Sequence, residues 1–226
     1  MTDTSPLEGR AFAAFLFDMD GTIITSIAAA ERVWSNWARS HDLDVAAFLP
    51  TIHGVRAIDT VRRQALPGVN AEREAAAISQ AEIEDTQGVE PISGAAKFLA
   101  ALPAERWAIV TSAPRALAAA RLEAAGIPAP KLMITADDVA HGKPDPEGYK
   151  LAAKRLGVDI RACLVFEDAP AGIAAGEAAG AAVVVITATH SHPVATHHAT
   201  ISSYDELRSV SEADGLRLAD LAPAAP

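Results

Sequence analysis

The stretch Phe15-Leu16-Phe17-Asp18-Met19-Asp20-Gly21-Thr22 places two carboxylates directly after an apolar run. The run, from Ala11 to Phe17, is short, rich in Phe and bounded by polar residues, which favours a buried strand over a helix. In an α/β sheet the chemistry lies at the carboxyl ends of the strands, where Asp18 and Asp20 would fall. Two acids so close together repel each other, so they need a cation, a shared proton or bulk water. A surface turn is the alternative, but it would not explain the apolar strand.

The bulk composition narrows the class of protein. The chain has 226 residues, half of them hydrophobic, which is enough to bury a core in one large domain or in a core with a smaller module. No apolar run approaches the ~18–20 residues of a membrane span, and the N-terminus lacks the basic segment of a secretory signal. The single cysteine, Cys163, fits a reducing compartment. The net charge of −10 argues against a nucleic-acid partner. We therefore expect a cytoplasmic protein without membrane or nucleic-acid partners.

Two patterns divide the chain. Beyond Pro91, helices alternate with short apolar strands, which we expect at 107–110, 132–134, 163–166 and 182–186. This alternation predicts an α/β core with a parallel sheet and right-handed crossovers. From Ser26 to Val89 there is no strand signal, and the pattern favours helices at 26–40, with Ser26 as the capping residue, at 56–66 and at 71–86. The expected domains are a core of residues 1–25 and 90–226 and a helical insertion of residues 26–89. We expect the ends, 1–10 and 211–226, to be loosely held.

Three later strand ends also carry polar residues. Thr111 and Ser112 follow the second expected strand, where a hydroxyl and adjacent amides suit a phosphoryl oxygen, although such residues are more often helix caps. Lys143 lies between a glycine and two prolines, after the third strand. Glu167 and Asp168 end the fourth. Because parallel strands present their carboxyl ends along one edge, we expect these groups to meet the two aspartates of the first strand.

These four stretches, in this order, resemble the motifs of the haloacid dehalogenase superfamily of phosphotransferases. The resemblance covers nearly the whole chain from Ala11 to Ile186. It implies a Rossmann-like, doubly wound core with a helical cap over the active site, with Asp18 as nucleophile and Asp20 as general acid/base. Such a carboxylate can attack phosphorus, while a second acid protonates the leaving oxygen and later deprotonates water. The dehalogenases themselves lack the second acid, so Asp20 argues for phosphoryl transfer.

The resemblance also implies roles for the other polar residues. The phosphate-binding residues that it implies are Thr111, Ser112 and Lys143. The metal ligands that it implies are Asp18, the backbone carbonyl of Asp20, and Asp168. Glu167 would be a further ligand or would hold a metal-bound water. Ligation by oxygen atoms alone, with retained water, is what Mg²⁺ prefers, so we expect Mg²⁺ as the cofactor.

A stretch in the insertion points to the substrate. His53-Gly54-Val55-Arg56-Ala57-Ile58-Asp59-Thr60 resembles a segment of the small sugar and polyol phosphatases, the group that acts on 2-deoxyglucose-6-phosphate, glycerol-3-phosphate and hexitol phosphates. His53, Arg56 and Asp59 are spaced so that they could share a face where a helix begins, and they suit a hydroxyl-rich substrate. A solvated helix start explains them equally well. The resemblance favours a phosphatase of small phosphorylated metabolites, with no obligate protein partner.

Two other functions remain open. A sugar phosphomutase like β-phosphoglucomutase shares the four motifs and the cap, but it must return the phosphoryl group to a sugar before water takes it. A non-enzymatic receiver domain also uses acids, Mg²⁺, a hydroxyl and a lysine on an α/β sheet. Receiver domains, however, have no long insertion after the nucleophile and do not need the second acid.

Four histidines, His190, His192, His197 and His198, follow the last expected strand. A second metal site is conceivable there. The segment offers no acid or cysteine at ligand spacing, so we expect these histidines to be solvent-exposed.

Overall fold

The computed structural model describes residues 7, 9–190, 195–205 and 207–220. Within them, a sheet of six parallel strands has the order β5-β4-β1-β6-β7-β8. The strands are β1 (Ala14–Phe17), β4 (Trp107–Val110), β5 (Met133–Ile134), β6 (Cys163–Glu167), β7 (Ala182–Ile186) and β8 (Ala199–Ile201). The expected parallel α/β sheet is therefore confirmed, and β1 lies inside it, between β4 and β6.

Helices cover both faces of this sheet, as a doubly wound fold requires. Phe15 and Phe17 of β1 pack into one hydrophobic core together with residues of α5 and α6. Ala14 and Leu16, which alternate with them, belong to a second core with residues of α7 and α8. The four helices are α5 (Ala95–Ala100), α6 (Arg115–Ala124), α7 (Glu147–Leu156) and α8 (Pro170–Ala179). The period-2 alternation along β1 thus links both layers to the strand that carries the aspartates.

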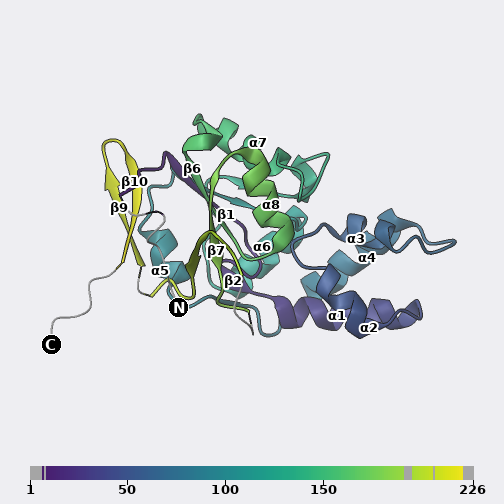
Figure 1. The fold of residues 1–226 in the computed structure, drawn as a ribbon. Coiled ribbons are helices and arrows are strands. Elements are labelled where there is room, and N and C mark those ends of the chain that lie inside the picture. Colours follow the sequence, from purple (N-terminus) through teal and green to yellow (C-terminus); the bar gives the residue numbers. More distant parts are fainter. Residues whose placement is uncertain (1–6, 8, 191–194, 206, 221–226) are drawn as a thin grey trace.

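Residues 26–89, which we call the cap, have a small core of their own. Trp34, Trp37 and Phe48 pack together there, with the two indole rings 5.6 Å apart. The cap helices are α1 (Ile27–Ser40), α2 (Val45–Phe48), α3 (Ala57–Arg63) and α4 (Ala71–Glu84), with a 3-10 turn at Leu49–Thr51. The chain leaves and re-enters the core through β2 (Ile24–Thr25) and β3 (Glu90–Pro91), which pair antiparallel. Figure 1 shows α1 to α4 grouped on one side of the sheet.

The expectation of loosely held ends is wrong for the described residues. Leu7 is buried. The strands β9 (Leu207–Glu212) and β10 (Gly215–Asp220) form an antiparallel hairpin, drawn in yellow in Figure 1. Leu216 of this hairpin is fully buried and exchanges backbone hydrogen bonds of 2.7 and 2.8 Å with Phe12, which leads into β1. Residues 1–6 and 221–226 lie outside the described residues.

Three local expectations need correction. Ser26 occupies the N-cap position of α1, but its hydroxyl donates to Asp20 instead of capping the helix. The helix expected at 56–66 ends at Arg63, and Ala65 has a positive φ of 50°. The strand β8 and the short helix α2 were not expected, although Asp44 caps α2 by accepting from two backbone N–H groups. In the described part of the chain, no helix has the length and apolar character needed to cross a bilayer.

Candidate active site

The loop after β1 fixes the first aspartate. The backbone N–H of Asp18 donates to the carbonyl of Phe166 at the end of β6, which places Asp18 beside the next strand end. Gly21 has a φ of +83°, and a Cβ there would lie 2.0 Å from Oδ2 of Asp168. The glycine therefore permits both the turn and the close approach of Asp168. Asp18 and Asp168 are 4% and 8% exposed, so the two acids meet in a nearly water-free place.

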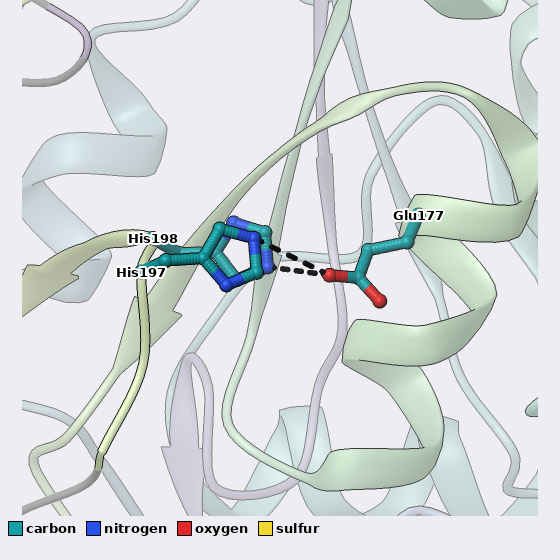
Figure 2. A group of neighbouring side chains, drawn as sticks. All are labelled: Glu177, His197 and His198. Carbon is teal, nitrogen blue, oxygen red and sulfur yellow. Dashed lines mark hydrogen bonds and ion pairs between the residues drawn. The ribbon is translucent and has the colours of Figure 1, made fainter.

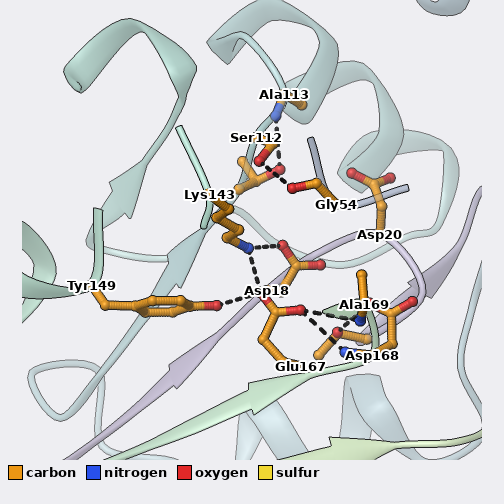
Figure 3. Close-up of polar contacts among 12 residues, drawn as sticks. Asp18, Asp20, Gly54, Ser112, Ala113, Lys143, Tyr149, Glu167, Asp168 and Ala169 are labelled. Carbon is orange, nitrogen blue, oxygen red and sulfur yellow. Dashed lines mark hydrogen bonds and ion pairs between the residues drawn. The ribbon is translucent and has the colours of Figure 1, made fainter. Parts of the chain in front are cut away.

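Lys143 joins the acids from the segment before α7. Its ammonium group donates to Asp18 and, at 2.6 Å, to Oε1 of Glu167 (Figure 3). The hydroxyl of Tyr149 donates to the same Oε1 at 2.6 Å. The other oxygen, Oε2, accepts from the backbone N–H groups of Asp168 and Ala169. Protein donors therefore contact both oxygens of Glu167, and this carboxylate holds Lys143 against Asp18.

The charges of this buried cluster are not balanced by protein groups alone. Burial raises the pKa of Asp18 well above its usual range, and Glu167 and Asp168 raise it further, against the opposing effect of Lys143. Burial, together with the nearby Glu167, raises the pKa of Asp168 to about 8. Burial disfavours the charge of Lys143, but Asp18 and Glu167 outweigh it, so the pKa of this lysine is raised. Three carboxylates thus share a single ammonium group, and they need additional positive charge to be ionised together.

The same cluster fits a hard divalent cation. Carboxylate oxygens of Asp18, Glu167 and Asp168 all lie within 4.8 Å of one another. Oxygen donors of this kind suit Mg²⁺ or a similar ion. The excess of negative charge gives a physical reason for such an ion to bind here, so the donor set fits the metal expected from the sequence.

The hydroxyls after β4 lie beside this cluster. Thr111 is 5% exposed, and its Oγ1 accepts from the backbone N–H of Ala113 at 3.1 Å. Ser112 donates through Oγ to the carbonyl of Gly54 at 2.9 Å, so it links the core to the cap. Both line the same pocket as Asp18 and Asp168. The four strand ends therefore converge as the sequence pattern indicated.

Asp20 is held differently from Asp18. Its Oδ1 accepts from the hydroxyl of Ser26 at 2.6 Å and from Nη1 of Arg121 at 2.9 Å. Arg121, on α6, also donates through Nη2 to Glu82 of the cap helix α4 at 3.1 Å. Burial raises the pKa of Glu82, although Arg121 opposes the shift. Asp20 is thus connected to the cap directly through Ser26 and indirectly through Arg121 and Glu82.

A pocket lies between the cap and the core at this point. It encloses about 690 Å³ of space outside the atoms, part of it open to solvent. The core contributes Asp18, Asp20, Thr111, Ser112 and Asp168 to its lining, and the cap contributes Trp34, His53, Ser79 and Glu82. The carboxylates therefore face a cavity in which one small molecule could contact both parts of the chain.

The three cap residues singled out in the sequence are not all in this pocket. His53 lines it and lies 3.5 Å from Glu31, and burial lowers the pKa of His53. Arg56 pairs with Asp59 at 2.6 Å and also donates to the backbone carbonyl of Ala140 in the core at 3.0 Å. Arg56 lines a smaller neighbouring cavity that Ser112 and Lys143 also line. In this arrangement Arg56 connects cap and core next to the lysine.

A family model for haloacid dehalogenase-like hydrolases matches residues 12–180. The chain belongs to this family. It is 42% identical over 186 residues to hexitol phosphatase A of Escherichia coli (strain K12), a match that covers 79% of this chain and 85% of the relative. It is also 38% identical over 197 residues to glycerol-1-phosphate phosphohydrolase 2 of Saccharomyces cerevisiae, covering 82% of this chain and 78% of that protein.

Solved structures agree with the fold of this haloacid dehalogenase-like hydrolase. A crystal structure of a hydrolase from Pseudomonas syringae superposes with a TM-score of 0.70 at 27% identity, covering 78% of this chain and 84% of that one. The structure of CbbY from Rhodobacter sphaeroides in complex with phosphate has a TM-score of 0.71 at 22% identity and covers 86% of this chain and 96% of its own. At that identity it supports the fold alone.

Sequence reasoning missed the hydrolase's buried contacts to Asp20 and Glu167. Arg121 falls on the buried stripe of α6 with Leu117 and Leu122, and Glu82 falls on the buried stripe of α4. A charged residue at an apolar position is the signal that could have found both. Tyr149, inside the helix that follows the lysine segment, gave no such signal because tyrosine is a common core residue.

The histidine segment departs from the expectation in one respect. His198 is largely buried, with a side chain that is 13% exposed, whereas His197 is exposed at 82%. An acid also approaches them, because Glu177 of α8 lies 2.9 Å from Nε2 of His198 and 3.7 Å from Nε2 of His197 (Figure 2). His190 contacts the backbone carbonyl of Asp168 through Nε2 at 3.0 Å. His192 lies outside the described residues.

Proposed function

We propose that this haloacid dehalogenase-like hydrolase is a Mg²⁺-dependent phosphatase of small sugar or polyol phosphate monoesters that works through an aspartyl-phosphate intermediate. The observation that carries the proposal is the contact of Lys143 with Asp18 in a buried acidic cluster that opens into the pocket between cap and core. The relatives named hexitol phosphatase and glycerol-1-phosphate phosphohydrolase support this substrate class. The substrate partner is then a small phosphorylated metabolite, and the cytoplasm is the proposed location.

The first half of the reaction transfers the phosphoryl group to the enzyme. A carboxylate oxygen of Asp18 attacks phosphorus, and the bond from phosphorus to the ester oxygen breaks. The electron pair stays on the leaving oxygen, which takes a proton from Asp20. Lys143 neutralises charge on the attacking carboxylate and on the phosphoryl oxygens, while the hydroxyl of Thr111 and the backbone N–H of Ser112 are the proposed hydrogen-bond donors to those oxygens.

The second half returns the enzyme to its starting state. Asp20 takes a proton from water as the water oxygen attacks phosphorus, and the bond between phosphorus and Asp18 breaks. Inorganic phosphate leaves, Asp18 is again a carboxylate and Asp20 is again protonated. The cycle consumes one water and needs no other reactant.

Asp18, Asp168 and the backbone carbonyl of Asp20 would hold the Mg²⁺ ion. When bound, the ion supplies positive charge that lets the acids stay ionised beside a phosphate dianion. Glu167 is proposed not to bind the ion directly, because its oxygens already accept from Lys143, from Tyr149 and from two backbone N–H groups.

The cap is proposed to select the substrate. His53 lines the pocket on the cap side, so it can contact the part of a substrate that lies beyond the phosphate. Arg56, which pairs with Asp59, lines the same small cavity as Lys143, and this pair is proposed to contribute to the recognition of hydroxyl groups when the cap closes. Replacing Arg56 with Ala is expected to raise KM for sugar phosphates more than for small aromatic phosphates.

The deciding experiment is a screen of sugar, polyol and nucleotide monophosphates with Mg²⁺ and without any bisphosphate activator. We expect multiple turnover with release of inorganic phosphate, loss of turnover in EDTA, and recovery on addition of Mg²⁺. The variant Asp18→Asn should be folded and inactive. A strict requirement for a bisphosphate, with a phosphorylated sugar as product, would instead indicate a phosphomutase, and a single stoichiometric phosphorylation without turnover would indicate a receiver-like switch.

A further inference from the structure

Arg121 connects two carboxylates that belong to different parts of the molecule. Its Nη1 donates to Asp20 after β1 at 2.9 Å, and its Nη2 donates to Glu82 on the cap helix α4 at 3.1 Å. The side chains of Arg121 and Glu82 are only 6% and 7% exposed. The Nε of Arg121 has no hydrogen-bond partner among the described residues. The guanidinium is therefore largely shielded from solvent. Its Nη1 contacts the core and its Nη2 contacts the cap.

Stability does not explain this arrangement. A buried ion pair gains little over a well-packed apolar pair, because the desolvation of the charges offsets their attraction. Burial even raises the pKa of Glu82, which means that the site disfavours the charge of this carboxylate. The rigid, planar fork of an arginine does, however, fix the positions of the two groups that it bonds. The contact is better suited to setting geometry than to holding the fold together.

The geometry that it sets includes the carboxylate of Asp20. Oδ1 of Asp20 accepts from Arg121 and from Ser26, and Ser26 is the N-cap residue of α1 in the cap. The orientation of Asp20 therefore depends on the cap through Ser26 directly and through Glu82 and Arg121 indirectly. A movement of α4 would pull on Glu82, and the guanidinium would transmit that movement to Asp20.

We propose that Arg121 is a positioning residue that couples the placement of the cap to the orientation of Asp20, the proton donor to the leaving oxygen. This inference rests on the proposed phosphatase function. With the cap in place, Glu82 and Ser26 hold the guanidinium and the carboxylate where proton transfer can occur. Without Arg121, the carboxylate of Asp20 keeps its hydrogen bond with Ser26 among the contacts that the described side chains make with it, and it is oriented less well.

Two matched substrates test this role. Phenyl phosphate and p-nitrophenyl phosphate have nearly the same shape, but the phenolate of the first needs a proton as it leaves, whereas the p-nitrophenolate does not. The ratio kcat/KM reports only the steps up to formation of the phosphoenzyme, so the return step shared by both substrates does not affect it. General acid catalysis contributes roughly 10²–10⁴-fold when the leaving group needs a proton.

We expect Arg121→Met to lower kcat/KM for phenyl phosphate at least about tenfold more than for p-nitrophenyl phosphate, a conservative part of the range for general acid catalysis. Glu82→Gln should show the same trend with a smaller difference, because Arg121 keeps its contact with Asp20. Arg121→Lys should recover part of the loss. The control is Arg115→Met on the same helix, where the arginine is half-exposed and bonds Asp138, and we expect no change there.

Equal losses on both substrates for Arg121→Met and for Glu82→Gln, with unchanged melting temperatures, would overturn the positioning role. If Arg121→Met does not fold, Arg121→Lys and Glu82→Gln give the same comparison. A wild-type enzyme that hydrolyses neither these esters nor any sugar phosphate would contradict the proposed function itself, which separates the two failures.

A second, independent observation concerns the C-terminal end of α8, whose N-terminal end follows Asp168 of the active site. One ring nitrogen of His197, one ring nitrogen of His198 and a carboxylate oxygen of Glu177 lie within 4.8 Å of one another. The two imidazole rings are 4.0 Å apart, and both point their Nε2 atoms at the same Glu177 oxygen (Figure 2). The backbone N–H of His198 donates to Oγ1 of Thr196, which fixes the turn that brings adjacent histidines to one side.

We infer that these three side chains form a site for a borderline divalent ion such as Zn²⁺. Two imidazoles and one carboxylate are a ligand set that Zn²⁺ uses, with a fourth position left for water. The site differs in chemistry from the all-oxygen cluster around Asp18, so the two should be filled by different ions. The ion would link His197 and His198, which precede β8, to Glu177 of α8.

Calorimetric titration with Zn²⁺ in saturating Mg²⁺ tests this site. Wild type should bind one Zn²⁺ per chain more than Glu177→Gln or His198→Gln, and Zn²⁺ should raise the melting temperature of wild type and of the control variant but not of these two site variants. The control is His141→Gln, because His141 is exposed and pairs with Glu147 away from the cluster. Equal stoichiometry in wild type and both site variants would overturn the inference. Hydrolysis of phosphate esters with Mg²⁺ should be unchanged in these variants.

Discussion

The hydroxyl of Tyr149 offers a direct test of how the buried cluster is held. Tyr149 is 1% exposed, and it donates to Oε1 of Glu167 at 2.6 Å, beside the ammonium group of Lys143. The substitution Tyr149→Phe removes this donor and keeps the ring. A hydrogen bond to a charged partner contributes roughly 1.5–3 kcal/mol, so we expect a loss of about 2 kcal/mol in the free energy of unfolding. For a chain of this size that corresponds to a fall of about 4–8 °C in Tm.

Tyr204 provides a matched control for this substitution. It is also 1% exposed, and its hydroxyl donates to the backbone carbonyl of Thr22 at 3.0 Å. That acceptor is neutral, so Tyr204→Phe should cost only about 1 kcal/mol. Both variants are measured by urea unfolding and by thermal denaturation in the same buffer. Comparing them cancels the effect of deleting a buried hydroxyl as such.

The two variants should also differ in activity. Tyr149→Phe removes one of the contacts that keep Glu167 against Lys143, so we expect kcat to fall several-fold while KM changes little. Tyr204→Phe should lower kcat less than Tyr149→Phe does, because the hydroxyl of Tyr204 donates to the backbone carbonyl of Thr22 instead of to Glu167. An unfolding loss for Tyr204→Phe that equals or exceeds that of Tyr149→Phe would refute the reasoning that Glu167 is a charged acceptor.

Other predictions follow from the same site. Lys143→Met leaves the acids without their ammonium partner, so turnover should fall by at least about 10² and Mg²⁺ should raise the melting temperature more than in wild type. Gly21→Ala should weaken apparent Mg²⁺ affinity in kinetic titrations, because its Cβ would lie 2.0 Å from Asp168, whereas Gly126→Ala, with φ +65° and nothing within 4 Å, should not. Burial and then the charge of Asp159 raise the pKa of Cys163 to about 12. Its reactive thiolate therefore forms only as the pH rises toward that value, and iodoacetamide at pH 8 should label Cys163 in denaturant but not in the native protein, as mass spectrometry would show.

The strand ends could be predicted from the sequence because each signal there is local. Asp18, Thr111, Lys143 and Asp168 each follow a short apolar run or a turn-forming segment, and a parallel sheet brings such positions to one edge. Neither the order of the strands nor the neighbours of each residue had to be known. The short, Phe-rich apolar run from Ala11 to Phe17 similarly indicated a buried strand.

The contacts between cap and core could not be predicted, because they depend on how two units dock. Arg121 and Asp20 are 101 positions apart, and no local pattern pairs them. Glu177 approaches His198 for the same kind of reason, which the expectation of exposed histidines overlooked. The C-terminal hairpin was missed because its strand β9 alternates weakly, with Leu207 as its buried residue, and its other core residues, Leu216 and Leu218, lie on β10.

The pairing of β2 with β3 places both chain crossings between cap and core side by side. The two ends of the cap are therefore neighbours in space. A cap from a relative could replace residues 26–89 at these two adjacent junctions without changing the distance between the two ends of the core chain. The graft would have to reproduce partners for Ser112 and Arg121, which contact Gly54 and Glu82 across the junction. If the cap selects the substrate as proposed, we expect chimeras that keep those two contacts to exchange substrate preference and to retain the same phosphorus chemistry.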